Sequence, residues 1–190
     1  MLALLRPALV LFFVLSLITG LAYPLLTTRV ATALFPYQAA GSLVFKDGKA
    51  VGSERIGQSF SDPRYFWSRP SATMPMPYNA SASGGANLGP LNPALPDAIR
   101  SRAAALRAAD PGNTAPVPVD LVTRSASGLD PHISVAAAEY QASRVARLRD
   151  LPLERVRTLI AEHTEGSAHD ILGDQRVNVL LLNLALDSAH

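Results

Sequence analysis

An uncharged apolar run near the start of the chain constrains the fold more than any other feature. Residues 7–28 carry no charged side chain and lie between Arg6 and Arg29. As an α-helix rising about 1.5 Å per residue, this run would be roughly 33 Å long, close to the ~30 Å hydrocarbon core of a bilayer. A helix also satisfies every backbone N–H and C=O internally, as lipid requires. The run predicts a membrane-spanning helix within an anchor over residues 1–36.

A cleaved signal peptide is the alternative explanation for this run. Gly20, Leu21 and Ala22 offer the small residues of a cleavage site. The apolar run continues through Leu25 and Leu26, which makes it longer than the apolar region of a typical signal peptide. This length favours a retained anchor.

The flanks of the run indicate an orientation. A six-residue N-terminal flank carrying Arg6 is easily left in the cytoplasm, which places the C-terminal domain outside. Tyr23, Phe35 and Tyr37 suit the outer interface. Ser16 and Gly20 are four residues apart, a spacing that would let another transmembrane helix approach closely.

Composition excludes several classes of function. The 17 basic and 15 acidic residues nearly balance, so the pI of about 9.2 reflects a small excess of charge. Arg144, Arg147 and Arg149 are predicted to form a solvated helix face. Without interleaved aromatic residues or a recognisable binding motif, nucleic-acid binding is not expected. The chain has no cysteine, which excludes thiol catalysis, thiolate metal sites and disulfides.

Residues 37–190 are expected to form one extracytoplasmic α+β domain with a small antiparallel sheet, a long ordered loop layer and about four helices. Asp47 and Gly48 between two short apolar runs predict a hairpin. Residues 53–60 would extend the sheet with Ile56 and Phe60 on one face, and residues 117–123 would add an edge strand.

A stretch of about 30 residues, 61–93, lacks periodicity and contains six prolines. Tyr65, Phe66, Trp67 and Tyr78 are too apolar for a disordered linker. We therefore expect an ordered loop layer whose aromatic side chains pack on the core.

Four helices are predicted in the remainder from capping residues and apolar periodicity. They begin near Asn92 and Pro93, after Ser134, at Pro152 and at Gln175. The side chains expected to face the core are Leu95, Ile99, Ala103 and Leu106, then Val135, Ala138, Ala142, Val145 and Leu148, then Leu153, Val156, Leu159, Ile160 and His163, and finally Val177, Leu180, Leu181 and Leu184.

The glycine-rich stretch at residues 83–90 invites a nucleotide-binding hypothesis. Gly84 and Gly89 have P-loop spacing, but Pro90 and Leu91 stand where Lys and Ser/Thr would be needed. The simpler interpretation is that the glycines permit tight turns at positive φ.

Two further groups of residues have the chemistry of a catalytic or metal site, but their spacing along the chain does not match known motifs. Ser127, Asp130 and His132 have the residue types of a hydrolytic triad, but no Gly-x-Ser-x-Gly elbow is present. A second group fits no standard metal-ligand spacing, so no metal site is predicted. Its members are Glu162, His163, Glu165, His169 and Asp170.

An ordered series of short blocks nevertheless resembles one family over essentially the whole chain. The blocks are Ile56-Gly57-Gln58-Ser59-Phe60, Tyr65-Phe66-Trp67-Ser68-Arg69-Pro70-Ser71-Ala72, Tyr78-Asn79, Ser83-Gly84-Gly85-Ala86-Asn87-Leu88-Gly89-Pro90, Pro118-Val119-Asp120-Leu121-Val122-Thr123, Ser125-Ala126-Ser127-Gly128-Leu129-Asp130-Pro131, Arg176-Val177-Asn178-Val179-Leu180 and Leu182-Asn183-Leu184-Ala185-Leu186. Together they resemble the C subunit of the bacterial Kdp high-affinity potassium-transporting ATPase.

The resemblance implies a non-catalytic, single-span subunit of an inner-membrane complex. Its partners would be a channel-like potassium-translocating subunit, a P-type ATP-hydrolysing subunit and a small one-helix peptide. Such a subunit is credited with assembly or stabilisation, and with acting as a catalytic chaperone that raises the ATP affinity of the pump subunit.

A direct nucleotide site is the alternative that the resemblance leaves open. Ser83, Gly84 and Gly85 are similar to the core of the ABC-transporter signature, although Ala82 and Ala86 stand in place of its Leu and Gln. The candidate residues are Gln58, Ser83, Gly84, Gly85, Asn87 and Gly89. This alternative conflicts with the orientation, because ATP is inside the cell and the domain is predicted outside. No directly bound cofactor is therefore expected, and ATP would act through the pump subunit.

Overall fold

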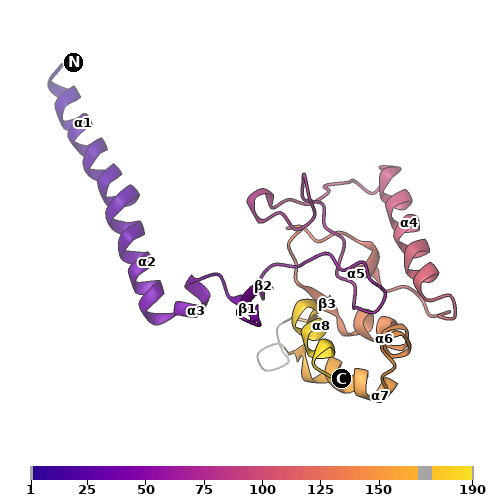
Figure 1. The fold of residues 1–190 in the computed structure, drawn as a ribbon. Coiled ribbons are helices and arrows are strands. Elements are labelled where there is room, and N and C mark those ends of the chain that lie inside the picture. Colours follow the sequence, from indigo (N-terminus) through magenta and orange to yellow (C-terminus); the bar gives the residue numbers. More distant parts are fainter. Residues whose placement is uncertain (1, 167–172, 190) are drawn as a thin grey trace. The chain divides into compact units, whose positions relative to one another are not determined.

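The computed structural model describes residues 2–166 and 173–189, and the chain divides into two compact units, Met1–Ala50 and Val51–His190. Figure 1 shows a long N-terminal helix in the first unit and a set of shorter helices in the second. The predicted α+β class is confirmed.

The first unit is dominated by one continuous helical rod. It consists of α1 (Leu2–Leu17), a π-helical turn (Ile18–Ala22) and α2 (Tyr23–Leu34). Within it, Ala3–Leu34 is long and apolar enough to cross a membrane, with a mean hydropathy of 2.3 in its most apolar window. It is the one such helix among the described residues.

The π-helical turn has a local cause at Pro24. Proline lacks an N–H, and in a regular helix its ring clashes with the carbonyl four residues earlier, which here belongs to Gly20. The turn is widened just before that point, and the N–H of Tyr23 bonds to the carbonyl of Ile18, five residues back. This irregularity is not apparent from the apolar pattern along the sequence.

Three threonine hydroxyls of the rod, those of Thr19, Thr27 and Thr32, donate to carbonyls of its own backbone. Thr19 donates to the carbonyl of Leu15 at 2.7 Å, and Thr32 donates to that of Thr28 at 2.8 Å. Such back-bonding is how a hydroxyl donor is satisfied where no water is within reach. Ser16 and Gly20 remain a predicted packing site; a Cβ added at Gly20 would meet no atom within 4 Å.

A short helix and a hairpin follow the rod. These are α3 (Pro36–Ala39) and strands β1 (Leu43–Lys46) and β2 (Lys49–Ser53), which pair in a two-stranded sheet. Asp47 and Gly48 join them with φ angles of +52° and +73°. Positive φ at both central residues is what a tight two-residue hairpin needs, so the predicted hairpin is confirmed.

The second unit contains a small antiparallel sheet with strand order β3–β5–β4. The strands are β3 (His132–Ser134), β4 (Thr164–Glu165) and β5 (Arg176–Asn178), with Ile133 opposite Val177. Both of these side chains are buried, so the sheet contributes directly to the core.

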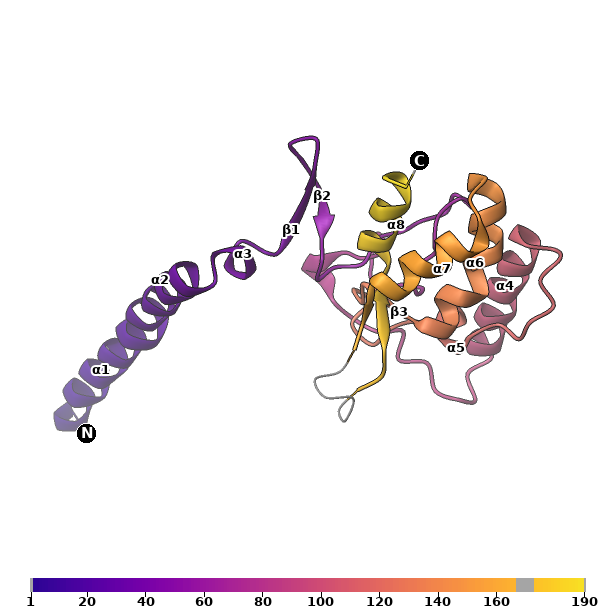
Figure 2. The ribbon, with the colours of Figure 1, turned by 90° about the horizontal axis from the view of Figure 1, so that it is seen from below.

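The described part of this unit also contains four longer helices, namely α4 (Ala94–Ala109), α6 (Val135–Arg149), α7 (Leu153–Glu162) and α8 (Val179–Asp187). Helix α6 packs along α7, and α7 packs against α8, as Figure 2 shows. The Ser134 side chain caps α6 by accepting from the N–H of Ala137 at 3.0 Å, as predicted. The core includes Phe66, Leu106, Ile133, Val145, Val156, Ile160, Val177, Leu182 and Leu186.

Several boundaries predicted from sequence are wrong. Residues 117–123 hold a short helix, α5 (Val119–Val122), because Pro118 precedes it and the carbonyl of Val119 accepts from Thr123. The predicted strand over residues 53–60 is absent: β2 ends at Ser53, and beyond it Ile56 forms only a bridge to Ser53. The last helix begins at Val179, after strand β5, because Asn178 caps it.

The register of two helices was also mispredicted in part. Leu148 of α6 is 42% exposed. In α8 the most buried apolar side chains include Leu182 and Leu186, whereas Leu181 and Leu184 are only half-buried.

Helix α4 begins at Ala94, one residue later than predicted, although Asn92 still accepts from its first N–H at 3.0 Å. Of its predicted core face, Leu106 is buried and Ile99 and Ala103 pack against the core, whereas Leu95 is half-buried and lines a surface cavity.

Candidate functional site

The glycine-rich loop, residues 83–90, is held against the segment that follows α5. The N–H of Gly84 and the hydroxyl of Ser83 both donate to the carbonyl of Ser127, at 2.9 and 3.0 Å. A Cβ added at Gly85 would lie 2.9 Å from the carbonyl oxygen of Ala126. The loop therefore needs glycine for close backbone approach at this position.

Tight turns at positive φ do not explain the loop glycines. Positive φ occurs among the described glycines at Gly41, Gly48, Gly128 and Gly173, so Gly84, Gly85 and Gly89 have ordinary backbone angles. Within the loop, it is Asn87 that has a positive φ, +49°. Asparagine tolerates this conformation better than most residues. The expectation of left-handed glycines in this loop was wrong.

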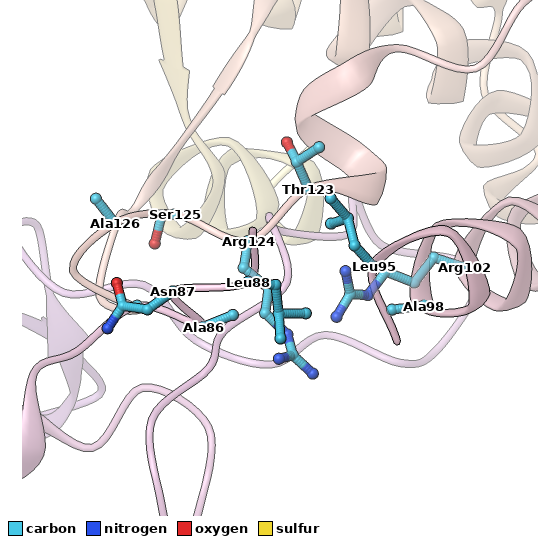
Figure 3. Close-up of a pocket in the computed structure, with 11 residues that line it drawn as sticks. Ala86, Asn87, Leu88, Leu95, Ala98, Arg102, Thr123, Arg124, Ser125 and Ala126 are labelled. Atoms are coloured by element: carbon cyan, nitrogen blue, oxygen red, sulfur yellow. The ribbon is translucent and has the colours of Figure 1, made fainter. Parts of the chain in front are cut away.

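Beside the loop lies a cavity of about 270 Å³. Its walls come from the loop, from α4 and from the segment after α5, as Figure 3 shows. The lining residues are Gly85, Ala86, Asn87, Leu88, Leu95, Ala98, Arg102, Thr123, Arg124, Ser125 and Ala126. They combine apolar side chains with two guanidinium groups and include no carboxylate.

The two arginines give the cavity its electrostatic character. Arg102 on α4 donates to the carbonyl of Val122 at 2.8 Å, which ties α4 to the end of α5. Partial burial, together with the positive charge of Arg124, lowers the pKa of Arg102. Two like charges on one cavity favour an anionic guest.

The other nucleotide candidate, Gln58, lies elsewhere. Its Nε2 donates to the carbonyl of Val51 at 2.7 Å, and it lines a different hollow with Gly57 and Tyr78. The structure thus brings Gly85 and Asn87 to one cavity and places Gln58 at another.

The hydrolytic constellation is not assembled. The hydroxyl of Ser127 accepts from the N–H of Leu129 at 3.1 Å, as in a turn. Both ring nitrogens of His132 face carboxylates at 3.5 Å, namely Asp130 and Glu165. His132 is therefore occupied by acidic neighbours and is not aligned with Ser127.

The metal candidates fall partly outside the described residues. His169 and Asp170 lie in residues 167–172, which the structure does not describe. Nδ1 of His163 lies 2.9 Å from the carbonyl of Leu159 within its own helix end. Across residues 2–166 and 173–189, no group of three or more His, Cys, Asp or Glu side chains could hold a metal ion.

A second feature of the loop layer is the way in which side chains hold its backbone. We call residues 64–67 the anchored segment, because side chains of α6 and α8 bond its backbone. Asn183 accepts from the N–H of Phe66 and donates to its carbonyl, at 2.9 and 3.0 Å. Gln141 does the same at Trp67, at 2.8 and 3.2 Å. The two amides replace a partner strand and satisfy backbone groups that would otherwise be buried unpaired.

Arginines complete the support of the anchored segment. Arg144 is 1% exposed, donates to the carbonyl of Tyr65 at 2.9 Å and lies 4.5 Å from the ring centre of Trp67. Burial lowers the pKa of Arg144 to about 10. Arg149 donates to the carbonyl of Arg64 at 2.8 Å.

The predicted solvated face at Arg144, Arg147 and Arg149 is therefore wrong for two of its three members. The side chain of Arg149 is 7% exposed, whereas that of Arg147 remains 56% exposed. The sequence does contain a signal for the burial of Arg144. Gln141, Arg144 and Val145 share one helix face, so Arg144 is a polar residue at a core-facing position, and this face meets the loop layer.

Comparison with known proteins agrees with the ordered series of sequence blocks. Residues 5–188 match the model of the family described as "KdpC: K+-transporting ATPase, c chain". A potassium-transporting ATPase KdpC subunit from Polaromonas naphthalenivorans is 71% identical over 97% of this chain and 94% of its own length. KdpC subunits of Variovorax paradoxus and Sorangium cellulosum are 69% and 65% identical, over 97% and 100% of this chain and 95% and 100% of their own lengths. The chain belongs to the KdpC family, the c chains of K+-transporting ATPases, and is a non-catalytic subunit of that complex.

Proposed function

We propose that the chain stabilises assembly of a high-affinity potassium-uptake complex and raises the ATP affinity of its pump subunit. Full-length membership in the KdpC family is the observation that carries this proposal. The partners would be the channel-like potassium-translocating subunit, the ATP-hydrolysing P-type subunit and the small one-helix subunit.

The two parts of the chain have separate proposed roles. Residues 1–36 anchor the protein in the inner membrane, and Ser16 and Gly20 would provide a face for a partner helix. Residues 37–190 form the extracytoplasmic domain, with the N-terminus in the cytoplasm. Support for this topology comes from the apolar rod and from Arg6 on its short N-terminal flank.

An external domain can change ATP affinity without touching ATP. It needs only to contact one conformation of the pump more favourably than another, which shifts the equilibrium between them. Coupling of this kind typically changes affinity by about 5- to 150-fold. A well-anchored, rigid loop layer suits such a role, because differential contact requires a surface of fixed shape.

Removing the chain tests the proposal. The other subunits would be expressed with and without it, solubilised and purified through a tag on the pump subunit. We expect the channel-like subunit to be lost from the purified material, or the KM for ATP of potassium-stimulated hydrolysis to rise about fivefold or more. Full assembly with an unchanged KM in the absence of the chain would contradict the proposal.

A direct nucleotide site remains the second candidate, favoured by the positively charged cavity beside Gly85 and Asn87. If it exists, a photoreactive ATP analogue should label the purified full chain near the glycine-rich loop. Gln58→Ala should leave labelling at this cavity unchanged, because Gln58 lies at a different hollow. Unlabelled protein would remove this candidate.

A further inference from the structure

We propose that the cavity beside the glycine-rich loop receives a carboxylate side chain of a partner subunit, held between Arg102 and Arg124. The inference rests on the proposed function, because it requires a partner. It adds a defined docking point and the chemistry that this point recognises.

The geometry of the two arginines carries the first step. They come from different elements, Arg102 from the middle of α4 and Arg124 from the segment after α5. Figure 3 shows their side chains extending into the same space next to Leu88. Arg102 is fixed by its bond to the carbonyl of Val122, so one of the two cationic walls is already in place.

The charge of the cavity is not compensated within the domain. Arg124 makes no hydrogen bond or ion pair in the part of the chain that the structure describes, and no carboxylate lines the cavity. Elsewhere in the domain, arginines are commonly paired: Arg69 with Asp130, Arg147 with Asp110 and Arg149 with Asp187, each at 2.9 Å. An external anion would supply the missing partner, and guanidinium groups bind carboxylates with two parallel hydrogen bonds.

The size and walls of the cavity favour a protein carboxylate over a nucleotide. At about 270 Å³ it lies below the 300–1,000 Å³ that is typical of small-ligand pockets. No aromatic ring lines it to stack on a base. Leu88, Leu95 and Ala98 instead offer an apolar wall for the methylene stem and neighbours of an Asp or Glu side chain.

A competition experiment in the assembled complex tests this docking point. Wild-type and variant chains with different tags would be co-expressed with the other subunits, and the ratio of the two in purified complex would be measured. The test variant is Arg124→Glu, with Arg124→Gln as a milder one. Arg107→Glu is the matched control, because Arg107 is an exposed arginine on α4, the helix that carries Arg102, but lies outside the cavity.

We expect Arg124→Glu to be under-represented in the complex by about 30-fold, since removing one member of a buried interfacial charge pair costs at least about that factor. Arg124→Gln should show the same direction, and Arg107→Glu should compete equally with wild type. Unchanged thermal unfolding of each variant chain would show that folding is not the cause. A photo-crosslinker at Ala126 should then capture a partner peptide containing Asp or Glu.

Equal incorporation of Arg124→Glu would overturn the inference. So would a variant that assembles normally but loses binding of ATP or inorganic phosphate, because the anion would then be a free ligand. Failure of the proposed function looks different: the complex would assemble fully with no copy of this chain at all.

Discussion

The anchored segment and the glycine-rich loop belong to the same irregular stretch of chain, yet they are built in opposite ways. The backbone of residues 64–67 is bonded by Asn183, Gln141 and Arg144, and Phe66 is fully buried. The loop at residues 83–90 is tied to its neighbour through Ser127 and borders an open cavity. Absence of regular secondary structure therefore has two meanings here: one part supports the fold, and the other presents a surface.

The largest difference in stability should come from truncating an apolar side chain in the anchored segment and one beside the glycine-rich loop. Phe66→Ala removes a fully buried ring from the core and should lower the free energy of unfolding by about 3–5 kcal/mol. Leu91→Ala, just after the glycine-rich loop, changes a side chain that is 96% exposed and should stay within about 0.5 kcal/mol. Denaturant unfolding of the full chain in detergent measures both. Similar losses of unfolding free energy for the two variants would contradict the distinction between a supporting segment and a surface loop.

The backbone support of the anchored segment should give the next largest effect. Asn183→Ala leaves both the N–H and the carbonyl of Phe66 without partners inside the protein. Each such group costs about 1–3 kcal/mol, so a loss of about 2–4 kcal/mol is expected. Ser83→Ala removes one bond from an exposed hydroxyl to Ser127 and should cost less than about 1 kcal/mol. Equal unfolding midpoints for these variants would contradict the assignment of support to α8.

Within the loop itself, substitution of two glycines distinguishes a position with close backbone contact from one with free space around it. Gly85→Ala places a Cβ 2.9 Å from the carbonyl oxygen of Ala126 and should cost about 1–3 kcal/mol. At Gly89 a Cβ would meet no atom within 4 Å, so Gly89→Ala should be neutral or stabilise by up to about 1 kcal/mol. Thermal unfolding of the pair checks this directly. A loss at Gly89 equal to that at Gly85 would refute the packing explanation.

The smallest expected effect is a pH dependence of stability that comes from the ion pair between Arg69 and Asp130. Arg69 lies just after the anchored segment, and Asp130 lies in the segment that holds the glycine-rich loop. Burial opposes ionisation of Asp130, but hydrogen bonds from His132 and Arg69 and the charge of Arg69 lower its pKa overall. A lowered pKa in the folded state adds stability above the unfolded pKa of about 4 that is lost as pH falls through the folded value. Asp130→Asn should therefore show a weaker loss of stability between about pH 5 and pH 2, by up to about 1 kcal/mol. An unchanged acid profile would show that this pair adds nothing.

Sequence patterns predicted the elements whose signals are local. The long apolar helix follows from a long uncharged run, the hairpin from Asp47 and Gly48, and the start of α6 from the cap at Ser134. These depend on neighbouring residues, which are visible along the chain. Strands of two or three residues such as β4 and β5 leave no periodicity, and they exist because distant segments pair.

The candidate site was predictable only in part for the same reason. The glycine-rich loop is visible as a motif, but its cavity depends on Arg102 and Arg124, which are 22 positions apart and carry no spacing signal. Likewise, the spacing of Arg144 with Arg147 and Arg149 resembles a solvated face. Its position on the face of Gln141 and Val145 indicates burial, but its partners Tyr65 and Trp67 are far away in sequence. Contacts at long sequence separation decide both cases.

Single-cysteine labelling tests most directly the central claim of an anchored, extracytoplasmic accessory domain. The chain has no cysteine, so Ser101→Cys on the exposed side of α4 and Ala3→Cys near the N-terminus each create one reactive thiol. A membrane-impermeant maleimide applied to intact spheroplasts making the complex should label Ser101→Cys at once, and Ala3→Cys only after permeabilisation. The reverse pattern would place the domain in the cytoplasm and contradict the account.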